Sequence, residues 1–213
     1  MRRVVAAALT SLLALPAMAA PVPFDGSWKT QKFSLFSSNQ YGFNGSSVSV
    51  VSDGSVSLAY RPLGTSYWGA TSAQWAWRVD EGVPATDLRQ KGGDDRNLAL
   101  YFVFLPESEA QRLQGSSVRR LLNNDAARVL VYVWGGAHNR GAVLNSPYLG
   151  NRGKTIVLRG SGTGTASENV NLARDYGNAF GSGTAALVGV ALSGDSDDTD
   201  TRIRAAISNL QVN

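Results

Sequence analysis

The chain has 213 residues, with 20 Lys and Arg against 16 Asp and Glu, a formal net charge of +4, no cysteine and one histidine. This composition excludes a zinc site and a cysteine–histidine catalytic pair, because it does not supply the ligands or the nucleophile that they need. The basic residues form no cluster, which argues against a nucleic acid partner, whose phosphates require several directed cations.

The first 19 residues have the pattern of an export signal. Arg2 and Arg3 precede the apolar stretch 4–15, and Ala17-Met18-Ala19 is a sequence that signal peptidase accepts. The apolar stretch is shorter than the roughly 20 residues that span a bilayer, and no later segment is long enough either. We therefore predict that residues 1–19 are a signal peptide.

Export of the remaining chain follows from this signal. We predict a single domain over residues 20–213 and a periplasmic or secreted location. Loss of Arg2 and Arg3 with the signal leaves 18 basic residues against 16 acidic ones and lowers the net charge from +4 to +2. Because no cysteine is present, a lipid anchor is excluded and core packing alone must hold the fold.

Most of this domain has the pattern of short β-strands. Residues 47–52 and 55–60 alternate polar and apolar side chains around Asp53-Gly54, which favours a hairpin with a type I′ turn, in which both central residues have positive φ. Several other strands are apolar on both faces, as in central strands covered on both sides. Strands are predicted at residues 28–35, 47–52, 55–60, 73–79, 98–105, 128–134, 155–160, 185–192 and 203–212. We expect an all-β fold, an antiparallel β-sandwich resembling a jelly roll.

Two segments interrupt the strands and predict short helices. Residues 106–122 are polar with scattered Leu and Val. Residues 169–180 place Leu172, Tyr176 and Phe180 on one helical face, with Asn169 as the cap and Gly181 as the end. The glycine-rich residues 160–165 lack the lysine of a P-loop and are interpreted as a flexible turn.

Residues 195–200 contain the densest group of acids in the chain. Carboxylates at a turn can supply oxygen ligands to Ca²⁺, which takes six to eight of them at about 2.3 to 2.6 Å. The alternative is a solvated turn whose acids accept backbone N–H bonds, with Arg202 or Arg204 offsetting their repulsion. The candidate calcium ligands are Asp195, Asp197, Asp198 and Asp200.

Catalysis in this chain would have to use carboxylates, tyrosine or arginine. Asp94 and Asp95 come directly before a predicted strand, with Arg96 beside them. Neighbouring strand residues point to opposite faces, so the two acids do not form one dyad unless the backbone turns, but one of them can meet Glu168 or Asp195. The alternative is a loop-end Asp paired with an arginine. The candidate catalytic residues are Asp94, Asp95, Glu168 and Asp175, with Asp197 as a further acid.

Aromatic residues are spaced two apart on two predicted strands. Such rings share one face of their strand and can stack on sugars, while nearby polar side chains supply hydrogen bonds. The alternative is ordinary packing in the core, which is the more common role of tryptophan on neighbouring strands. The candidate ligand-binding residues are Trp75, Trp77, Arg78, Tyr132, Trp134, Asn145 and Tyr148.

The order of these motifs along the chain is more specific than any one of them. It runs through Trp75-Ala-Trp77-Arg78, Asp94-Asp95-Arg96, Tyr132-Val-Trp134, Asn145-Ser-Pro147-Tyr148, Glu168, Asp175-Tyr176, Phe180-Gly181 and Asp195-Ser-Asp197-Asp198-Thr199. In this order the chain resembles a family of exported bacterial proteins, the domain of unknown function family 3047 (DUF3047). The resemblance covers about residues 28–213, is strongest from Trp75 onward and implies export and one domain, but no activity.

The last motif departs from the family's pattern. Ser196, Asp198 and Asp200 stand where the family has Thr, Asn and Gly, which adds two acids and removes a turn glycine. Whether relatives share a ligand at this turn is therefore open.

Three functions remain open at this point. The first is a non-catalytic sandwich that binds a carbohydrate or similar envelope ligand, with Ca²⁺ at the acidic turn. The second is a glycan-cleaving enzyme, which needs two carboxyl groups about 5 to 10 Å apart at one groove. The third is an envelope interaction protein without a small-molecule site.

Overall fold

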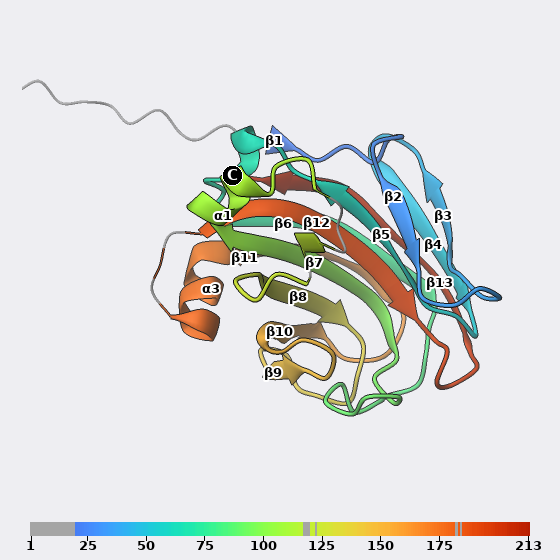
Figure 1. Cartoon of the computed structure of the whole chain (residues 1–213). Helices are drawn as coiled ribbons and strands as arrows, with labels where there is room; N and C mark the ends of the chain where they lie inside the picture. Colours follow the sequence, from blue (N-terminus) through green and yellow to red (C-terminus); the bar gives the residue numbers. More distant parts are fainter. Residues whose placement is uncertain (1–19, 117–119, 122, 182, 184) are drawn as a thin grey trace, which may run out of the picture.

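The structure is a computed structural model that describes residues 20–116, 120–121, 123–181, 183 and 185–213. The predicted signal peptide lies outside the described residues. Two β-sheets pack face to face, which confirms the predicted all-β sandwich with short helices (Figure 1). Among the described helices, none combines the length and the apolar character needed to cross a membrane.

One sheet has six strands, paired antiparallel throughout. Its strands are β1 (Ala20–Pro21), β3 (Gln40–Phe43), β4 (Ser47–Asp53), β6 (Ser72–Glu81), β11 (Gly164–Asn171) and β13 (Arg202–Val212). They lie in the order β11-β6-β13-β4-β3, with β1 beside β13.

The other sheet has seven strands in the order β2-β5-β12-β7-β8-β10-β9, which Figure 1 shows from one edge to the other. Its strands are β2 (Lys29–Lys32), β5 (Ser57–Pro62), β7 (Arg96–Pro106), β8 (Arg128–Trp134), β9 (Val143–Ser146), β10 (Gly150–Arg159) and β12 (Ala185–Asp195). β8 and β10 pair in parallel, so this sheet is mixed rather than purely antiparallel.

The inner faces of the two sheets enclose the main core, and its centre is aromatic. Trp75 and Trp77 of β6 lie against Phe102 of β7 and against Tyr132 and Trp134 of β8, with ring centroids 5.7 to 6.1 Å apart. The three tryptophans are only 2%, 1% and 5% exposed. The prediction that these rings form a ligand-stacking face is therefore corrected: they fill the space between the sheets, where no ligand reaches them.

The seven-stranded sheet also buries part of its outer face. Ala99, Val103 and Leu105 alternate with the inward residues of β7 and belong to a second apolar cluster. This cluster includes Ala110 of α1 (Glu107–Arg112) and residues of the loops over the sheet. The central strands are thus covered on both sides, as their apolar sequences predict.

The predicted hairpin at Asp53-Gly54 is wrong. β4 pairs with β3 and β13, whereas β5 pairs with β2 and β12, so the chain crosses here from one sheet to the other. A type I′ turn needs positive φ at both central residues, and only Gly54, at +48°, has it. Buried Ser52 and Ser55 hold the crossover through hydrogen bonds to each other and to Ser196.

The second predicted helix begins later than expected. Residues 164–171 form β11 along the edge of β6, where Glu168 and Val170 are buried at alternate positions. α3 (Leu172–Phe180) then starts with Asn171, not Asn169, as its cap, because the Asn171 side chain accepts the Arg174 N–H at 2.8 Å. Gly181, with φ of +88°, ends the helix as predicted.

The first helix is shorter than the predicted 106–122. α1 spans Glu107–Arg112, and residues 117–119 and 122 lie outside the described residues. A one-turn 3₁₀ helix, η1 (Thr65–Tyr67), was not predicted.

Removing a central ring tests the corrected role of the tryptophans. We expect Trp77→Ala to lower the free energy of unfolding by about 3 to 5 kcal/mol, because it leaves a large cavity in the core. Phe36→Ala, at a ring that is 99% exposed, should change it by less than about 0.5 kcal/mol. Urea unfolding of residues 20–213 measures both, and equal small losses would contradict the core assignment.

Candidate functional site

A cavity of about 500 Å³ lies over the outer face of the seven-stranded sheet. Its floor is apolar and is formed by side chains of β5, β7, β8 and β12, namely Leu58, Val103, Val129, Val131 and Ala191. One end is polar and contains four acids, one buried arginine and two hydroxyl groups, namely Asp94, Asp195, Asp197, Asp198, Arg96, Tyr101 and Ser193. The cavity therefore combines an apolar body with a charged end.

The register between β7 and β12 assembles the polar end. The two strands are antiparallel, and Asp195, the last residue of β12, is paired with Arg96, the first residue of β7. The acids before β7 and the acids after β12 are about 100 positions apart in sequence, and this register makes them neighbours. The sequence identifies these acids as candidates, but only the long-range pairing of β7 with β12 brings them close together.

Arg96 is the centre of this end. Its Nη1 donates to Asp94 Oδ2 at 2.8 Å and pairs with Asp195 Oδ2 at 3.1 Å, while its Nη2 donates to the Tyr101 hydroxyl at 3.0 Å. Tyr101 in turn is 3.0 Å from Ser193 Oγ. All three charged side chains of this group are at most 11% exposed, so the ions depend on each other for compensation.

Gly135 allows the chain to approach Arg96 closely. Its φ is +149°, and a Cβ at this position would lie 2.8 Å from the Arg96 Cα atom. A side chain here would push the end of β8 away from the segment that carries the site.

Tyr148 closes the cavity from the loop between β9 and β10. Its hydroxyl donates to Asp94 Oδ1 at 2.9 Å, and its ring is 55% exposed. The Lys91 ammonium lies 5.5 Å from the ring centroid. Burial, and then the charge of Asp94, raise the pKa of the Tyr148 hydroxyl. Tyr148 is thus a hydrogen-bond donor that also presents a ring face.

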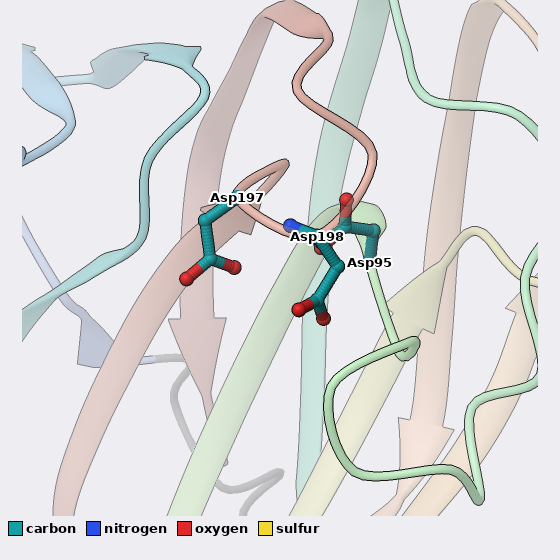
Figure 2. Close-up of side chains that lie close together, drawn as sticks. All are labelled: Asp95, Asp197 and Asp198. Carbon is teal, nitrogen blue, oxygen red and sulfur yellow. Dashed lines mark hydrogen bonds between the residues drawn. The ribbon is translucent and has the colours of Figure 1, made fainter.

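Asp95 points away from Arg96 and holds the acidic turn. Its carboxylate accepts hydrogen bonds from the backbone N–H groups of Asp198 and Thr199, at 3.3 and 2.8 Å, and from the Thr199 hydroxyl at 2.5 Å. In the solvated-turn alternative, acids within the turn accept these backbone N–H bonds. In the structure they are accepted by Asp95, which directly precedes β7. Figure 2 shows the carboxyl groups of Asp197 and Asp198 on the same side of the turn, with Asp95 beside Asp198.

Three of these carboxylates form a compact group. Asp95, Asp197 and Asp198 each offer one oxygen, and the three oxygens lie within 4.8 Å of one another. Asp200, a predicted ligand, is not part of this group; it has φ of +48°, and its carboxylate lies close to Gly54. Asp195 is not in the group either, but its carboxyl group contacts that of Asp197.

The carboxyl group of Asp195 is in an unfavourable environment for a negative charge. Burial, together with contact with Asp197 and the charge of Asp95, raises its pKa to about 8 against the lowering effect of Arg96. Its Oδ1 atom is buried and accepts no hydrogen bond from the described residues. The pKa of Asp198 is also raised, by burial and by the charges of Asp197, Asp95 and Asp94.

A buried polar network fixes the turn to the sheet crossover. Ser196 Oγ lies 2.8 Å from Ser52 Oγ, and the Asn39 side chain donates to the Gly194 carbonyl at 2.8 Å. Ser55 Oγ donates to Asn39 Oδ1 at 2.9 Å. The turn is therefore held at its base, while Asp197 and Asp198 are exposed.

The other two predicted catalytic acids lie elsewhere. Glu168 on β11 is buried and pairs with Arg140 at 3.0 Å and Arg159 at 2.8 Å. Asp175 on α3 accepts the Tyr132 hydroxyl at 2.8 Å and pairs with Arg174 at 3.1 Å. Neither residue lines the cavity, so the predicted acids do not form one constellation.

Two polar members of the predicted ligand set are also elsewhere. Arg78 is exposed and pairs with Asp80 at 3.1 Å. The Asn145 side chain accepts a hydrogen bond from Lys154 and does not line the cavity. Among the predicted ligand-binding residues, Tyr148 alone lines it.

Tyr101 and Ser193 belong to the site without being part of any sequence motif. Tyr101 stands among apolar residues of a predicted strand, and Ser193 directly follows the apolar run 185–192. A polar side chain at an outward position on each of two central strands is the signal that points to a polar patch on their shared face.

The sequence profile of a family described as "Protein of unknown function (DUF3047)" matches residues 26–211, nearly the whole chain. The match confirms the resemblance that the order of the motifs indicates. A comparison with curated protein sequences finds no match.

Three solved structures are similar to the chain over most of its length. The xyloglucanase domain of NopAA, a type three effector from Sinorhizobium fredii, in complex with cellobiose, has 9% identity and a TM-score of 0.48, covering 93% of this chain and 99% of that one. The K1 cleaved adhesin domain of Lys-gingipain from Porphyromonas gingivalis has 9% identity and a TM-score of 0.36, covering 92% and 98%. A loop swap mutant of Necallimastix patriciarum Xyn11A has 11% identity and a TM-score of 0.36, covering 87% and 99%. Similarity at this level carries no information about activity.

Arg96 should be essential for stability. Arg96→Met leaves Asp94 and Asp195 buried without their shared cation, so we expect a loss of about 3 to 5 kcal/mol in the free energy of unfolding. Arg78→Met breaks the exposed pair with Asp80 and should cost less than about 1 kcal/mol. Chemical denaturation measures the free energy of unfolding of both variants. A loss in Arg96→Met as small as that in Arg78→Met would show that the buried ion group is not needed for stability.

Proposed function

Because the chain belongs to the DUF3047 family, whose description assigns no activity, we propose its function from the geometry of the cavity. The protein is exported and binds a carbohydrate, or a similar amphipathic envelope ligand, over the outer face of the seven-stranded sheet.

The observation that supports this proposal most is the division of the cavity into two parts. The aliphatic floor around Val103 and Val131 offers surface to the apolar side of a ligand. The hydroxyl and carboxylate groups around Arg96 concentrate hydrogen-bonding groups at one end. Sugars have this same division, with C–H groups on the ring faces and hydroxyls at the edges.

Tyr148 supports the same assignment. Its ring is half exposed at the mouth of the cavity, while its hydroxyl is fixed by Asp94. A ring that is held at one edge and open on its face can stack on a sugar with little loss of side-chain freedom.

The charge of the lining favours a neutral or cationic ligand. Four acids line the cavity against Arg61 and Arg96, and both arginines already contact acids. An anionic ligand would therefore meet net repulsion, whereas the hydroxyls of a neutral glycan can donate to the carboxylates.

A binding experiment with residues 20–213 tests the proposal. We expect at least one of cellohexaose, xylohexaose and chitohexaose to bind measurably by isothermal titration calorimetry. Tyr148→Ala should then weaken binding about tenfold, because loss of an aromatic contact costs more than about 1 kcal/mol. Tyr148→Phe keeps the ring and should retain most of the affinity.

Phe36→Ala is the matched control, since it removes an exposed ring that does not line the cavity. An equal loss of affinity in Phe36→Ala and Tyr148→Ala would place binding outside the cavity. Absence of binding by all three saccharides would count against a carbohydrate ligand and favour an interaction protein without a small-molecule site.

A second candidate function is cleavage of a glycan, and one observation favours it. Asp94 and Asp195 line the same cavity and are both within 3.1 Å of one Arg96 nitrogen. Glycosidases place two carboxyl groups about 5 to 10 Å apart at the bond they cleave. Incubation with the same saccharides tests whether the protein cleaves glycans. New reducing ends that appear with the wild type and are absent with Asp94→Asn would indicate an enzyme.

A further inference from the structure

The end of the sandwich at the start of β7 contains more buried acid than buried base. Asp94, Asp95 and Asp195 are each at most 5% exposed, and Arg96 is the only cation that contacts any of them among the described residues. Asp95 has backbone and hydroxyl donors but no ion pair. Buried carboxylates in this number need a further positive charge nearby.

The exposed acids of the turn extend this group toward solvent. Asp197 and Asp198 bring their oxygens within 4.8 Å of each other and of Asp95 (Figure 2). Asp95 is held in place by its three hydrogen bonds, so the group has one rigid member and two that lie on an open turn.

A separate observation points to a missing partner at this place. The buried Oδ1 atom of Asp195 accepts no hydrogen bond from the part of the chain that the structure describes, although Asp195 is only 5% exposed. The carboxyl group of Asp195 also contacts that of Asp197. Two carboxyl groups in contact, one with an unpaired buried oxygen, are stabilised by a shared proton or by a cation that replaces it.

We propose that Asp95, Asp197 and Asp198 bind one Ca²⁺ ion, next to Asp195, whose carboxyl group contacts that of Asp197. The proposed ligand set differs from a site built from the turn alone, because its rigid member comes from the start of β7. Asp200 does not take part. The ion joins the ends of β7 and β12, which also carry the polar end of the cavity.

The size and chemistry of the group favour calcium over other divalent ions. Oxygens that share one Ca²⁺ ion lie at most about 4.6 to 5.2 Å apart, twice the usual bond length, and the three oxygens of this group lie within 4.8 Å of one another. Mg²⁺ demands near-ideal octahedral geometry at about 2.0 to 2.1 Å and gives up its water reluctantly, whereas Ca²⁺ accepts an irregular set of oxygens. The group has no nitrogen or sulfur ligand, which disfavours Zn²⁺ and Cu²⁺.

The ion is proposed independently of any carbohydrate. The chain could bind a sugar without calcium, or calcium without a sugar. The two proposals can therefore fail separately, and each is tested by its own measurement. Ion binding and thermal stability, rather than sugar binding, test the calcium site.

The test uses residues 20–213 after treatment with EDTA and dialysis. We expect calorimetric titration with CaCl₂ to show one site per chain, and the melting temperature to rise by about 5 to 10 °C at a hundredfold excess over Kd. MgCl₂ at the same concentration should give less than half of this rise.

Two substitutions on the same turn locate the site. Asp197→Asn should weaken Ca²⁺ binding about tenfold or more, because it removes a charged ligand. Asp200→Asn removes the same charge, tolerates the positive φ of its position and should leave Kd within about threefold. No calcium-dependent heat or shift in the wild type would overturn the proposal, and so would equal weakening by both variants, since that indicates diffuse attraction of cations.

Discussion

The buried guanidinium of Arg96 is the interaction on which the site depends. It stands at the first residue of β7, opposite the last residue of β12, and it contacts the carboxylates of Asp94 and Asp195 and the hydroxyl of Tyr101. An arginine so enclosed is stable only with partners of opposite charge, and those partners come from two distant parts of the chain. The ion group therefore fixes the β7–β12 register at this end of the sheet and brings the two acidic segments together.

The two faces of the seven-stranded sheet have different roles because their side chains differ. The inner face packs tryptophan, tyrosine and phenylalanine rings against the other sheet and leaves them almost no exposure. The outer face has smaller aliphatic residues and is only partly covered, which leaves the cavity. The packed core and the proposed binding surface thus lie on opposite faces of the same strands, and alternation along β7 separates them residue by residue.

The sequence predicted the central strands but not β3, β9 or β11, and it predicted the site only in part. Strands such as β8 and β12 could be predicted because apolar runs and alternation are local properties. The Asp53-Gly54 turn was mistaken for a hairpin because the dipeptide is a local signal, whereas the sheet that each flanking strand joins is decided by distant partners. For the same reason, Asp95 could not be joined to Asp197 and Asp198, since that contact requires the β7–β12 register. The tryptophans failed as a ligand face because spacing two apart shows a shared face but not which side of the sheet it occupies.

An NMR titration of ¹⁵N-labelled residues 20–213, first with CaCl₂ and then with the saccharide that binds best, tests most directly whether the β7–β12 junction is the functional site. The account predicts that amide signals of Asp95, Asp197 and Thr199 shift with calcium, and that those of Tyr101 and Tyr148 shift with the saccharide. The indole signals of Trp75 and Trp77 should stay unchanged, because these rings lie between the sheets. Shifts confined to the indoles and to the neighbourhood of Glu168, with none at the junction, would contradict the account.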